Sequence, residues 1–324
     1  TIGAWSSNKI YDLRKTPYTV ILHFGGKALE GSEGYWGQFR DVFDPSFAAE
    51  LKKRVEQEKG KSAGDPWCLG YFIDNEIAWG DDLSLAVATL KSPAAQAAKQ
   101  VFIADLKAQY TDIAKFNEAW NTSHASWDAL LESRDLPAKD KLTAAAKADL
   151  GAFYTKFAEK YFQVCRDTLK ATAPKQLYLG CRFAWVNDRA AAAAAKYCDV
   201  ISYNLYHKSI ADFKTNVGDL PLIVGEFHFG ALDRGLFHTG LVPVQTQAER
   251  AAAYKAYVEG ALKHPQFVGV HWFQYMDEPT TGRTLDGENY QIGFLDGCDT
   301  PYLETVAAAR EVSAEMYALR GGKK

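Results

Sequence analysis

Short apolar runs that end in polar residues alternate along this chain with longer amphipathic stretches. Their hydrophobic residues are continuous rather than alternating, which is typical of parallel strands covered on both faces. The runs that predict strands are Tyr18–Phe24, Leu69–Glu76, Leu177–Phe183, Val200–Tyr203, Leu222–Glu226 and Phe267–Trp272, with Thr1–Ser7 as a shorter candidate. The order of strand and helix indicates an α/β protein.

The stretches between these runs predict helices. Asp44 is a suitable N-cap and Pro45 a suitable first-turn residue for a helix that continues through Lys59. Ser92-Pro93 opens a second helical region in the same way. The remaining predicted helices are Ala94–Tyr110, Asp112–Trp120, Leu142–Thr172, Asp188–Tyr197, Thr246–Lys263 and Pro301–Leu319. Gly25–Gln38 and Asn121–Leu136 are predicted to be connections.

Polar residues end five successive strands, and this pattern distinguishes two α/β folds. The residues are Glu76, Arg182, Tyr203, Glu226 and the pair Trp272 and Gln274. A barrel of parallel strands brings all five to one mouth, where such barrels build their active sites. An open sheet concentrates its site at one switch point, and the chain has no glycine-rich phosphate loop. We therefore predict a (β/α)8 TIM-type barrel.

The predicted barrel is one strand short, because only seven strands are recognisable. We expect residues 1–320 to form a single, incomplete β/α-barrel domain without the first strand, and residues 321–324 to form a disordered tail. An incomplete barrel leaves two strand edges exposed, which proteins normally cover. We expect a loop, a side-chain plug or a neighbouring subunit of a homo-oligomer to cover them.

Composition excludes several classes of function. A formal net charge of -3 gives no electrostatic case for binding nucleic acid or an anionic membrane. No segment approaches the ~18 apolar residues of a membrane span. The 5 cysteines are odd in number and form no CxxC pair, which argues against a zinc site or a disulfide framework, although one disulfide stays open. The compartment is not readable from the N-terminus.

Two lone carboxylates at strand ends carry the strongest chemical signal. Retaining glycosidases use one carboxylic acid to protonate the leaving oxygen and a second, ionised carboxylate to attack the sugar carbon. Glu76 and Glu226 end strands three positions apart, so a barrel places both over its mouth. Asn75, directly before Glu76, supplies an amide for the sugar 2-hydroxyl. A loop or salt-bridge role is the alternative for either glutamate alone.

Several residues near these strand ends are candidates for supporting roles. Tyr203 or Tyr206 is expected to hydrogen-bond the nucleophile and hold it ionised, or else to pack at the barrel rim. Arg182 either lowers the pKa of the nucleophile by charge proximity or forms a structural ion pair. His228 lies two residues past Glu226, so it faces the same way on an extended chain and contacts a sugar hydroxyl or caps a loop.

Aromatic side chains supply candidates for sugar binding. Trp272, at the end of the last strand, is the expected stacking platform under the reacting ring. Trp36, Trp185 and Tyr275 are candidates for outer sugar sites, as is Trp79, with plain packing as the alternative for each.

We predict no metal and no cofactor. Asp277, Glu278, Asp286 and Glu288 match no calcium-loop spacing, so solvated loop acids are the preferred interpretation. The histidines lack metal-ligand spacing as well. The expected partner is an oligosaccharide or polysaccharide substrate.

The motifs in this chain resemble a known group of enzymes. Asn75-Glu76 after one strand, with Glu226 three strands later, resembles the pattern of the clan A glycoside hydrolases. Gly225–Gly240 and His271–Asp296 resemble the catalytic domain of family 50 β-agarases, and the motifs IDNE at 73–76 and SYNLY at 202–206 match it too. The resemblance implies that Glu76 is the acid/base and Glu226 the nucleophile. It also suggests a secreted or periplasmic protein.

Departures from that family leave alternatives open. Its members carry an N-terminal domain and a first barrel strand, and we expect this chain to lack both. The resemblance therefore bears more on mechanism than on substrate. A sugar-binding barrel with weak or no catalysis, or a fragment that folds only with another piece, is the alternative to a glycosidase.

Overall fold

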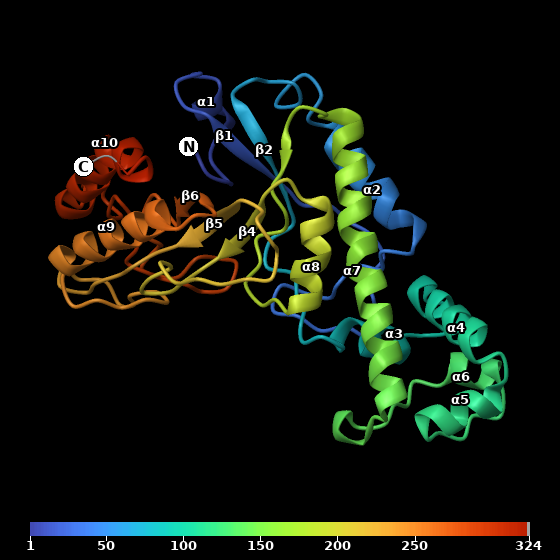
Figure 1. Cartoon of the computed structure of the whole chain (residues 1–324). Helices are drawn as coiled ribbons and strands as arrows, with labels where there is room; N and C mark the ends of the chain where they lie inside the picture. The colour runs from blue at the N-terminus through green and yellow to red at the C-terminus, as the bar shows by residue number, and fades with distance from the viewer. Residues whose placement is uncertain (323–324) are drawn as a thin grey trace. The chain divides into compact units, whose positions relative to one another are not determined.

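The computed structural model describes residues 1–322 and contains the elements drawn in Figure 1. The strands are β1 (Tyr18–Leu22), β2 (Cys68–Ile73), β3 (Leu177–Tyr178), β4 (Ile201–Asn204), β5 (Leu222–Phe227) and β6 (Phe267–Trp272). The helices are α1 (Asn8–Tyr11), α2 (Pro45–Glu56), α3 (Ser84–Lys91), α4 (Ala97–Tyr110), α5 (Ile113–Trp120), α6 (Trp127–Glu132), η1 (Lys139–Lys141), α7 (Ala144–Thr172), α8 (Asp188–Tyr197), α9 (Gln247–Lys263) and α10 (Leu303–Arg320).

The chain divides into two compact units. The N-terminal unit combines Ser7–Ile201 with Thr215–Gly218, and the C-terminal unit combines Thr1–Ser6, Ser202–Lys214 and the chain from Asp219 onward. Each unit holds one three-stranded sheet, in the orders β1-β2-β3 and β4-β5-β6. The single domain expected over residues 1–320 stays a prediction.

The sheet of the N-terminal unit is parallel and carries Glu76 beyond the end of its central strand. β2 pairs with β1 on one side and β3 on the other. β3 is regular over two residues only, although the strand was predicted to continue to Phe183. Gly180 (φ 78°) and Arg182 (φ 55°) break the extended conformation. Backbone hydrogen bonds nevertheless continue beyond β3. The Ile73 amide donates to the Gly180 carbonyl (2.9 Å), and the Glu76 amide donates to the Arg182 carbonyl (3.3 Å).

The predicted strand at Thr1–Ser7 is wrong. Only Ile2 makes a single β-bridge, after which the chain turns, and Trp5 has a φ of 59°. Ser7 instead caps α1, since its side chain accepts a hydrogen bond from the Lys9 amide. Residues 1–322 therefore contain six strands rather than seven. Beyond α10, Gly321 and Gly322 form a turn, and the last two residues of the expected tail lie outside the described part.

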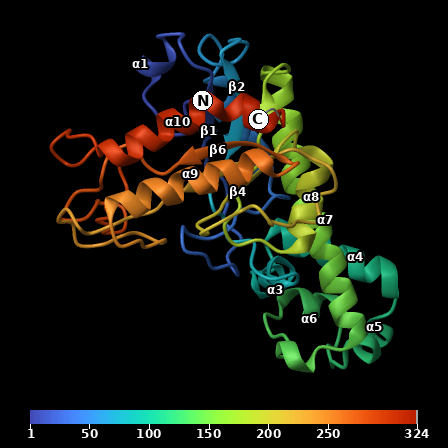
Figure 2. The ribbon, with the colours of Figure 1, turned by 60° about the vertical axis from the view of Figure 1, so that its left-hand side comes forward.

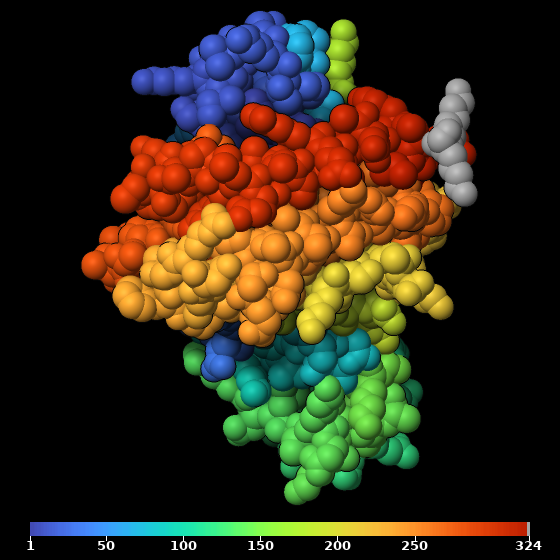
Figure 3. Space-filling model, turned by 90° about the vertical axis from the view of Figure 1, so that its left-hand side faces the viewer, coloured from blue at the N-terminus to red at the C-terminus, as the bar shows by residue number. Residues whose placement is uncertain are grey.

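The sheet of the C-terminal unit is covered by helices α9 and α10. These two helices run side by side in both Figure 2 and Figure 3. All six residues of β5 are buried. The Tyr257 ring of α9 stacks on Phe227 of β5, with centroids 4.2 Å apart, and its hydroxyl donates to the Leu205 carbonyl (2.8 Å). Helix α9 is thus packed against β5 at Phe227, the residue next to Glu226.

The predicted helix starts agree with the structure at Asp44 but not at Ser92-Pro93, because Ser92 is the C-cap of α3 and Gln96 is the N-cap of α4. Asp44 caps α2 through the Ser46 amide, and α8 has the predicted bounds. Helices α3 and α6 were missed. Both are short, and α6 lies within the expected connection Asn121–Leu136. Among residues 1–322 no helix has the length and apolar character needed to cross a membrane.

Asp149 of α7 joins the long helix to the α4–α5 region. Its buried carboxylate accepts hydrogen bonds from Gln109 (2.9 Å), Tyr110 (2.7 Å) and Trp120 (2.8 Å). We predict that Asp149→Ala lowers the free energy of unfolding by about 3 kcal/mol, because three donors lose their acceptor, among them the buried indole N–H of Trp120. Urea unfolding measures the change.

Asp105 supplies the matched control. It pairs with Lys156 on the surface, where 44% of its side chain is exposed. Asp105→Ala should cost less than about 1 kcal/mol. Equal losses in the two variants would show that the Asp149 network does not stabilise the protein.

Candidate functional site

Glu76 follows β2 in a backbone conformation that L-residues rarely adopt. Asp74 has a φ of 66° and Glu76 a φ of 49°, and Arg182, beside them, has a φ of 55°. Each non-glycine residue held in this region costs on the order of 1 kcal/mol, and such residues cluster at functional sites. Three such residues lie at the end of one sheet. Their backbone conformation lowers the stability of the fold but sets the direction of their side chains.

Asp74 anchors the segment 24–40, which follows β1, to the end of β2. Its carboxylate is ion-paired with Arg40 and accepts a hydrogen bond from the Tyr161 hydroxyl (2.7 Å). Burial raises the pKa of Tyr161, and the charge of Asp74 raises it further, so the phenol stays protonated and donates. Arg40 also donates to the Phe24 carbonyl (3.1 Å). The end of β2 is therefore tied to both ends of the segment 24–40.

Asn75 is oriented by Arg182. The Arg182 Nε donates to the Asn75 Oδ1 (2.7 Å), and the buried guanidinium lies 5.0 Å from the centroid of the Phe72 ring. This bond fixes which end of the amide faces Arg182. The sequence pattern indicated only carboxylates as partners of Arg182, and it did not predict this contact with an amide.

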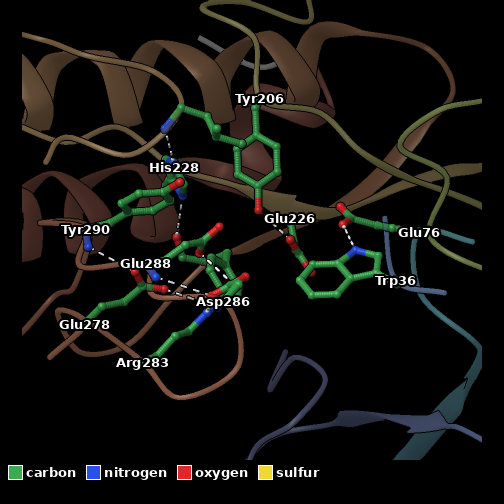
Figure 4. A network of polar contacts seen from close by, with 12 residues as sticks. Trp36, Glu76, Tyr206, Glu226, His228, Glu278, Arg283, Asp286, Glu288 and Tyr290 are labelled. Atoms are coloured by element: carbon green, nitrogen blue, oxygen red, sulfur yellow. Dashed lines mark hydrogen bonds and ion pairs between the residues drawn. The ribbon is translucent and has the colours of Figure 1, made fainter. Parts of the chain in front are cut away.

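Trp36 is the aromatic candidate that reaches a carboxylate. Its indole Nε1 donates to Glu76 Oε2 (3.1 Å), as Figure 4 shows. The contact joins the loop between β1 and α2 to the residue expected to act as the acid/base. Trp36 is 38% exposed as a residue, so part of it remains open to solvent.

Glu226 lies in β5, where it is 5% exposed. The Tyr206 hydroxyl donates a hydrogen bond to Glu226 Oε2 (Figure 4). The Glu226 carbonyl accepts from the Leu205 amide (2.9 Å), which holds the two segments together. Tyr206 is one of the two tyrosines proposed for this role. The buried ring of the other, Tyr203, packs edge-on against Phe213, with ring centroids 5.2 Å apart.

His228 holds loops together through both of its ring nitrogens. Nε2 accepts from the Leu241 amide (2.8 Å), so Nδ1 carries the proton and donates to the Phe273 carbonyl (3.2 Å). Burial lowers the pKa of His228 to about 3, which keeps the ring neutral. Its ring lies 4.6 Å from that of Tyr206. His228 therefore supports the Tyr206–Glu226 pair, and its nitrogens are not aimed at a sugar.

Trp272 packs inside the C-terminal unit. Its indole donates to the Ile292 carbonyl (2.8 Å), and its ring contacts Phe227, Tyr254 and Phe294. These contacts favour packing over the expected stacking role, although Trp272 is only partly buried. Trp79 is fully buried, whereas Trp185 and Tyr275 are exposed.

The acidic residues near the C-terminus are not solvated loop acids, which corrects the preferred interpretation. Asp277 is buried and accepts from the amides of Ile292 (2.9 Å) and Gly293 (2.7 Å). Glu278 is also buried and accepts from the Tyr290 amide (2.9 Å). The spacing of these acids along the chain could not reveal these partners, because the partners lie more than ten residues away in the sequence.

Arg283 gathers the other acidic side chains (Figure 4). It pairs with Asp286 (2.6 Å), Glu288 (2.8 Å) and Glu278 (3.2 Å). Burial raises the pKa of Glu288 to about 7. The positive charge of Arg283 lowers this pKa in part, and the negative charge of Glu278 raises it. Within residues 1–322, no group of three or more His, Cys, Asp or Glu side chains is arranged to hold a metal ion, and all 5 cysteines are free thiols.

Three residues of the site were missed from the sequence. Asp74 stands next to Asn75-Glu76 and was the one detectable signal, because a third polar residue at a strand end needs a partner. Arg40 and Tyr161 are 34 and 87 residues away from Asp74, so no local pattern links them.

Comparison with known proteins gives a consistent picture. The glycoside hydrolase family 42 model, described as Beta-galactosidase, matches residues 38–232, more than half of the chain. The chain is 40% identical over 342 residues to Beta-agarase B of Vibrio sp. (strain JT0107), and this match covers 99% of the chain and 35% of that protein. The chain thus spans about a third of the length of this relative.

Solved structures agree with these matches. An exo-beta-agarase superposes with a TM-score of 0.91 at 38% identity, covering 98% of this chain and 46% of that one. The beta-galactosidase of the psychrophile Marinomonas ef1 has a TM-score of 0.66 at 14% identity, covering 98% and 52%, a likeness of fold alone. The similarity to β-agarases confirms that part of the resemblance drawn from the motifs, and the clan A assignment stays a prediction.

The buried neutral His228 predicts a pH dependence of stability. The folded-state pKa of about 3 lies below the ordinary value of 6.5, so between these values the unfolded chain binds one more proton. The free energy of unfolding should therefore rise with pH in this window, by up to about 1.4 kcal/mol per pH unit from this group. His228→Gln should remove that slope in urea unfolding between pH 4 and 6.5.

His207 is exposed and serves as the control. His207→Gln should leave the slope unchanged, because an exposed imidazole meets water in both states. An unchanged slope in His228→Gln would show that His228 is protonated in the folded protein.

Proposed function

Since the chain belongs to glycoside hydrolase family 42, whose model is described as Beta-galactosidase, we propose that it hydrolyses β-linked galactose-containing glycans. The reaction is a double displacement that retains the anomeric configuration. Glu76 is the acid/base and Glu226 is the nucleophile. One observation carries this assignment: each carboxylate meets a dedicated donor at a strand end, Trp36 for Glu76 and Tyr206 for Glu226.

The proposed frame is a β/α barrel of the clan A type. The parallel pairs β1–β2, β2–β3 and β5–β6 support it, with helices between most successive strands, as does the fold likeness to a solved β-galactosidase. Retention requires the two carboxyl groups to lie about 5–5.5 Å apart across the scissile bond. The similarity to β-agarases favours agar-type galactans as the substrate class.

The first step forms a glycosyl ester. The Glu226 carboxylate attacks the anomeric carbon while Glu76 gives its proton to the glycosidic oxygen, which leaves with the departing sugar chain. Tyr206 holds Glu226 in position by its hydrogen bond and satisfies one carboxylate oxygen in a buried site. Arg182 orients Asn75, whose amide is suited to the sugar 2-hydroxyl.

The second step reverses the first. Glu76, now ionised, removes a proton from water, which attacks the anomeric carbon and releases Glu226. The indole N–H of Trp36 meets this ionised form and stabilises it. The sugar leaves with its original β-configuration.

A sugar-binding protein without turnover is the alternative. Misplacement of the carboxylates by ~1 Å is enough to cost about a hundred-fold in rate. Calorimetric binding of agar oligosaccharides with no released product would select this alternative. Turnover with β-anomer release, seen by NMR during the first minutes, would exclude it.

Variants of the two glutamates test their roles. Glu226→Ala should abolish turnover, because no covalent intermediate forms. Glu76→Gln should slow substrates with poor leaving groups by about 10²–10⁴-fold, and activated nitrophenyl glycosides far less, because they leave without a proton. Steady-state kinetics on agar oligosaccharides and nitrophenyl β-galactoside measure both. Glu50→Gln on the surface of α2 is the control, and full activity in both site variants would refute the assignment.

Tyr206→Phe tests the support of the nucleophile. Loss of the hydroxyl should lower kcat by about 10–100-fold with little change in KM, since the ring still packs beside His228. Tyr317→Phe on exposed α10 should match wild type. An unchanged kcat in Tyr206→Phe would exclude a role for this bond in the reaction.

A further inference from the structure

All the exposed Phe, Tyr and Trp side chains of the N-terminal unit are found in one place. Every residue of this unit is described, and the exposed aromatic residues in it are Tyr35 (66%), Trp36 (38%) and Trp185 (51%). Other large rings of the unit, such as Trp79 and Trp120, are buried. Exposed aromatic surface costs free energy in water, so its concentration at one point indicates a binding role.

The three rings form a connected group beside Glu76. Tyr35 meets Trp36 edge-on at a centroid distance of 4.6 Å and an interplanar angle of 89°. Tyr35 lies 6.1 Å from Trp185, at 50°. Trp36 continues the group to the carboxylate through its hydrogen bond to Glu76 Oε2. We name Tyr35, Trp36 and Trp185 the aromatic platform.

The loop that displays Tyr35 and Trp36 is rigid although its tip is exposed. The Leu29 amide donates to the Phe39 carbonyl (2.7 Å), and the Ser32 hydroxyl accepts from the Phe39 amide (2.9 Å). Gly34 packs so closely that an added Cβ would lie 2.6 Å from the Ala78 Cβ. The loop base is thus closed, and its tip packs on the segment after Glu76.

The loop base is also tied to the helices behind it. The Gly31 amide donates to Ser92 Oγ (2.9 Å), and the Arg40 guanidinium is ion-paired with Asp74. Because the loop is fixed before any ligand arrives, little conformational entropy is lost when a ligand binds.

Trp185 is displayed by an independent anchor. It precedes Asn187, which caps α8 through the Ala190 amide (3.1 Å). The Asn187 side chain also donates to the Gly80 carbonyl (3.0 Å) and to the Tyr154 hydroxyl (2.7 Å). Two separate pieces of backbone are therefore held in place around one exposed aromatic surface.

We propose that the aromatic platform binds the leaving-group part of the glycan, the sugars beyond the scissile bond on the side that departs with the glycosidic oxygen. This inference rests on the proposed function. The acid/base protonates that oxygen, so the aromatic surface that adjoins Glu76 adjoins the departing chain. The C–H faces of galactose units are apolar and flat enough to cover aromatic rings, and their burial supplies binding free energy. The enzyme therefore favours substrates that continue past the cleaved bond.

The test compares substrates with and without a leaving-group sugar. Agar oligosaccharides place sugars on the platform, whereas β-galactosyl fluoride places only a fluorine there. In Trp185→Ala and in Tyr35→Ala, the ratio of kcat/KM for the oligosaccharide to kcat/KM for the fluoride should fall about ten-fold or more, mostly through KM. Ten-fold corresponds to about 1.4 kcal/mol. Tyr317→Ala on α10, 82% exposed, is the matched control and should keep the wild-type ratio.

If the ratio of the two kcat/KM values changes in neither variant, the inference is overturned. This holds whether kcat/KM falls equally for both substrates or stays at the wild-type value for both. Calorimetric titration of agar oligosaccharides onto Glu226→Ala, with and without Trp185→Ala, gives a readout that needs no turnover. Weaker binding in the double variant supports the platform, and equal binding overturns it. Wild-type protein that cleaves neither substrate would refute the proposed function, and the titration would still decide whether the platform binds sugar.

Discussion

A carboxylate placed at the end of a buried strand must find donors in the protein to replace the water that it loses, and this constraint governs both halves of the candidate site. Asp74 is held by Arg40 and Tyr161, and Glu226 by Tyr206. An unpaired buried charge would cost several kcal/mol. The donors therefore have to arrive from distant segments, and in doing so they bring those segments to the strand ends.

The donors also explain why the loops around the site are ordered. Arg40 ties the segment that carries Trp36 to the end of β2, next to Glu76. In the C-terminal unit, His228 joins the backbone of Leu241 and Phe273 and supports the ring of Tyr206. Both units use the same arrangement, in which a buried polar residue fixes loops and an aromatic donor reaches the glutamate proposed to react.

Local sequence pattern was sufficient to predict several strand ends and helix starts, but insufficient to predict contacts between distant residues. Apolar runs located Glu76 and Glu226 at strand ends, and Asp44-Pro45 located the start of α2, because both signals are local. Thr1–Ser7 failed as a strand since its final serine caps a helix instead. Asp277 and Glu278 were misjudged, and Arg40 was missed, because their partners are distant in sequence and only the folded chain brings them together.

We propose that Glu226 becomes covalently bound to sugar during the reaction. Incubation with an activated 2-deoxy-2-fluoro-β-galactoside slows the second step and lets the ester accumulate, and mass spectrometry of the digested protein locates it. We expect one added fluorogalactosyl group per chain, on Glu226. A label on Glu76 or on another residue, or turnover without any label, would contradict it.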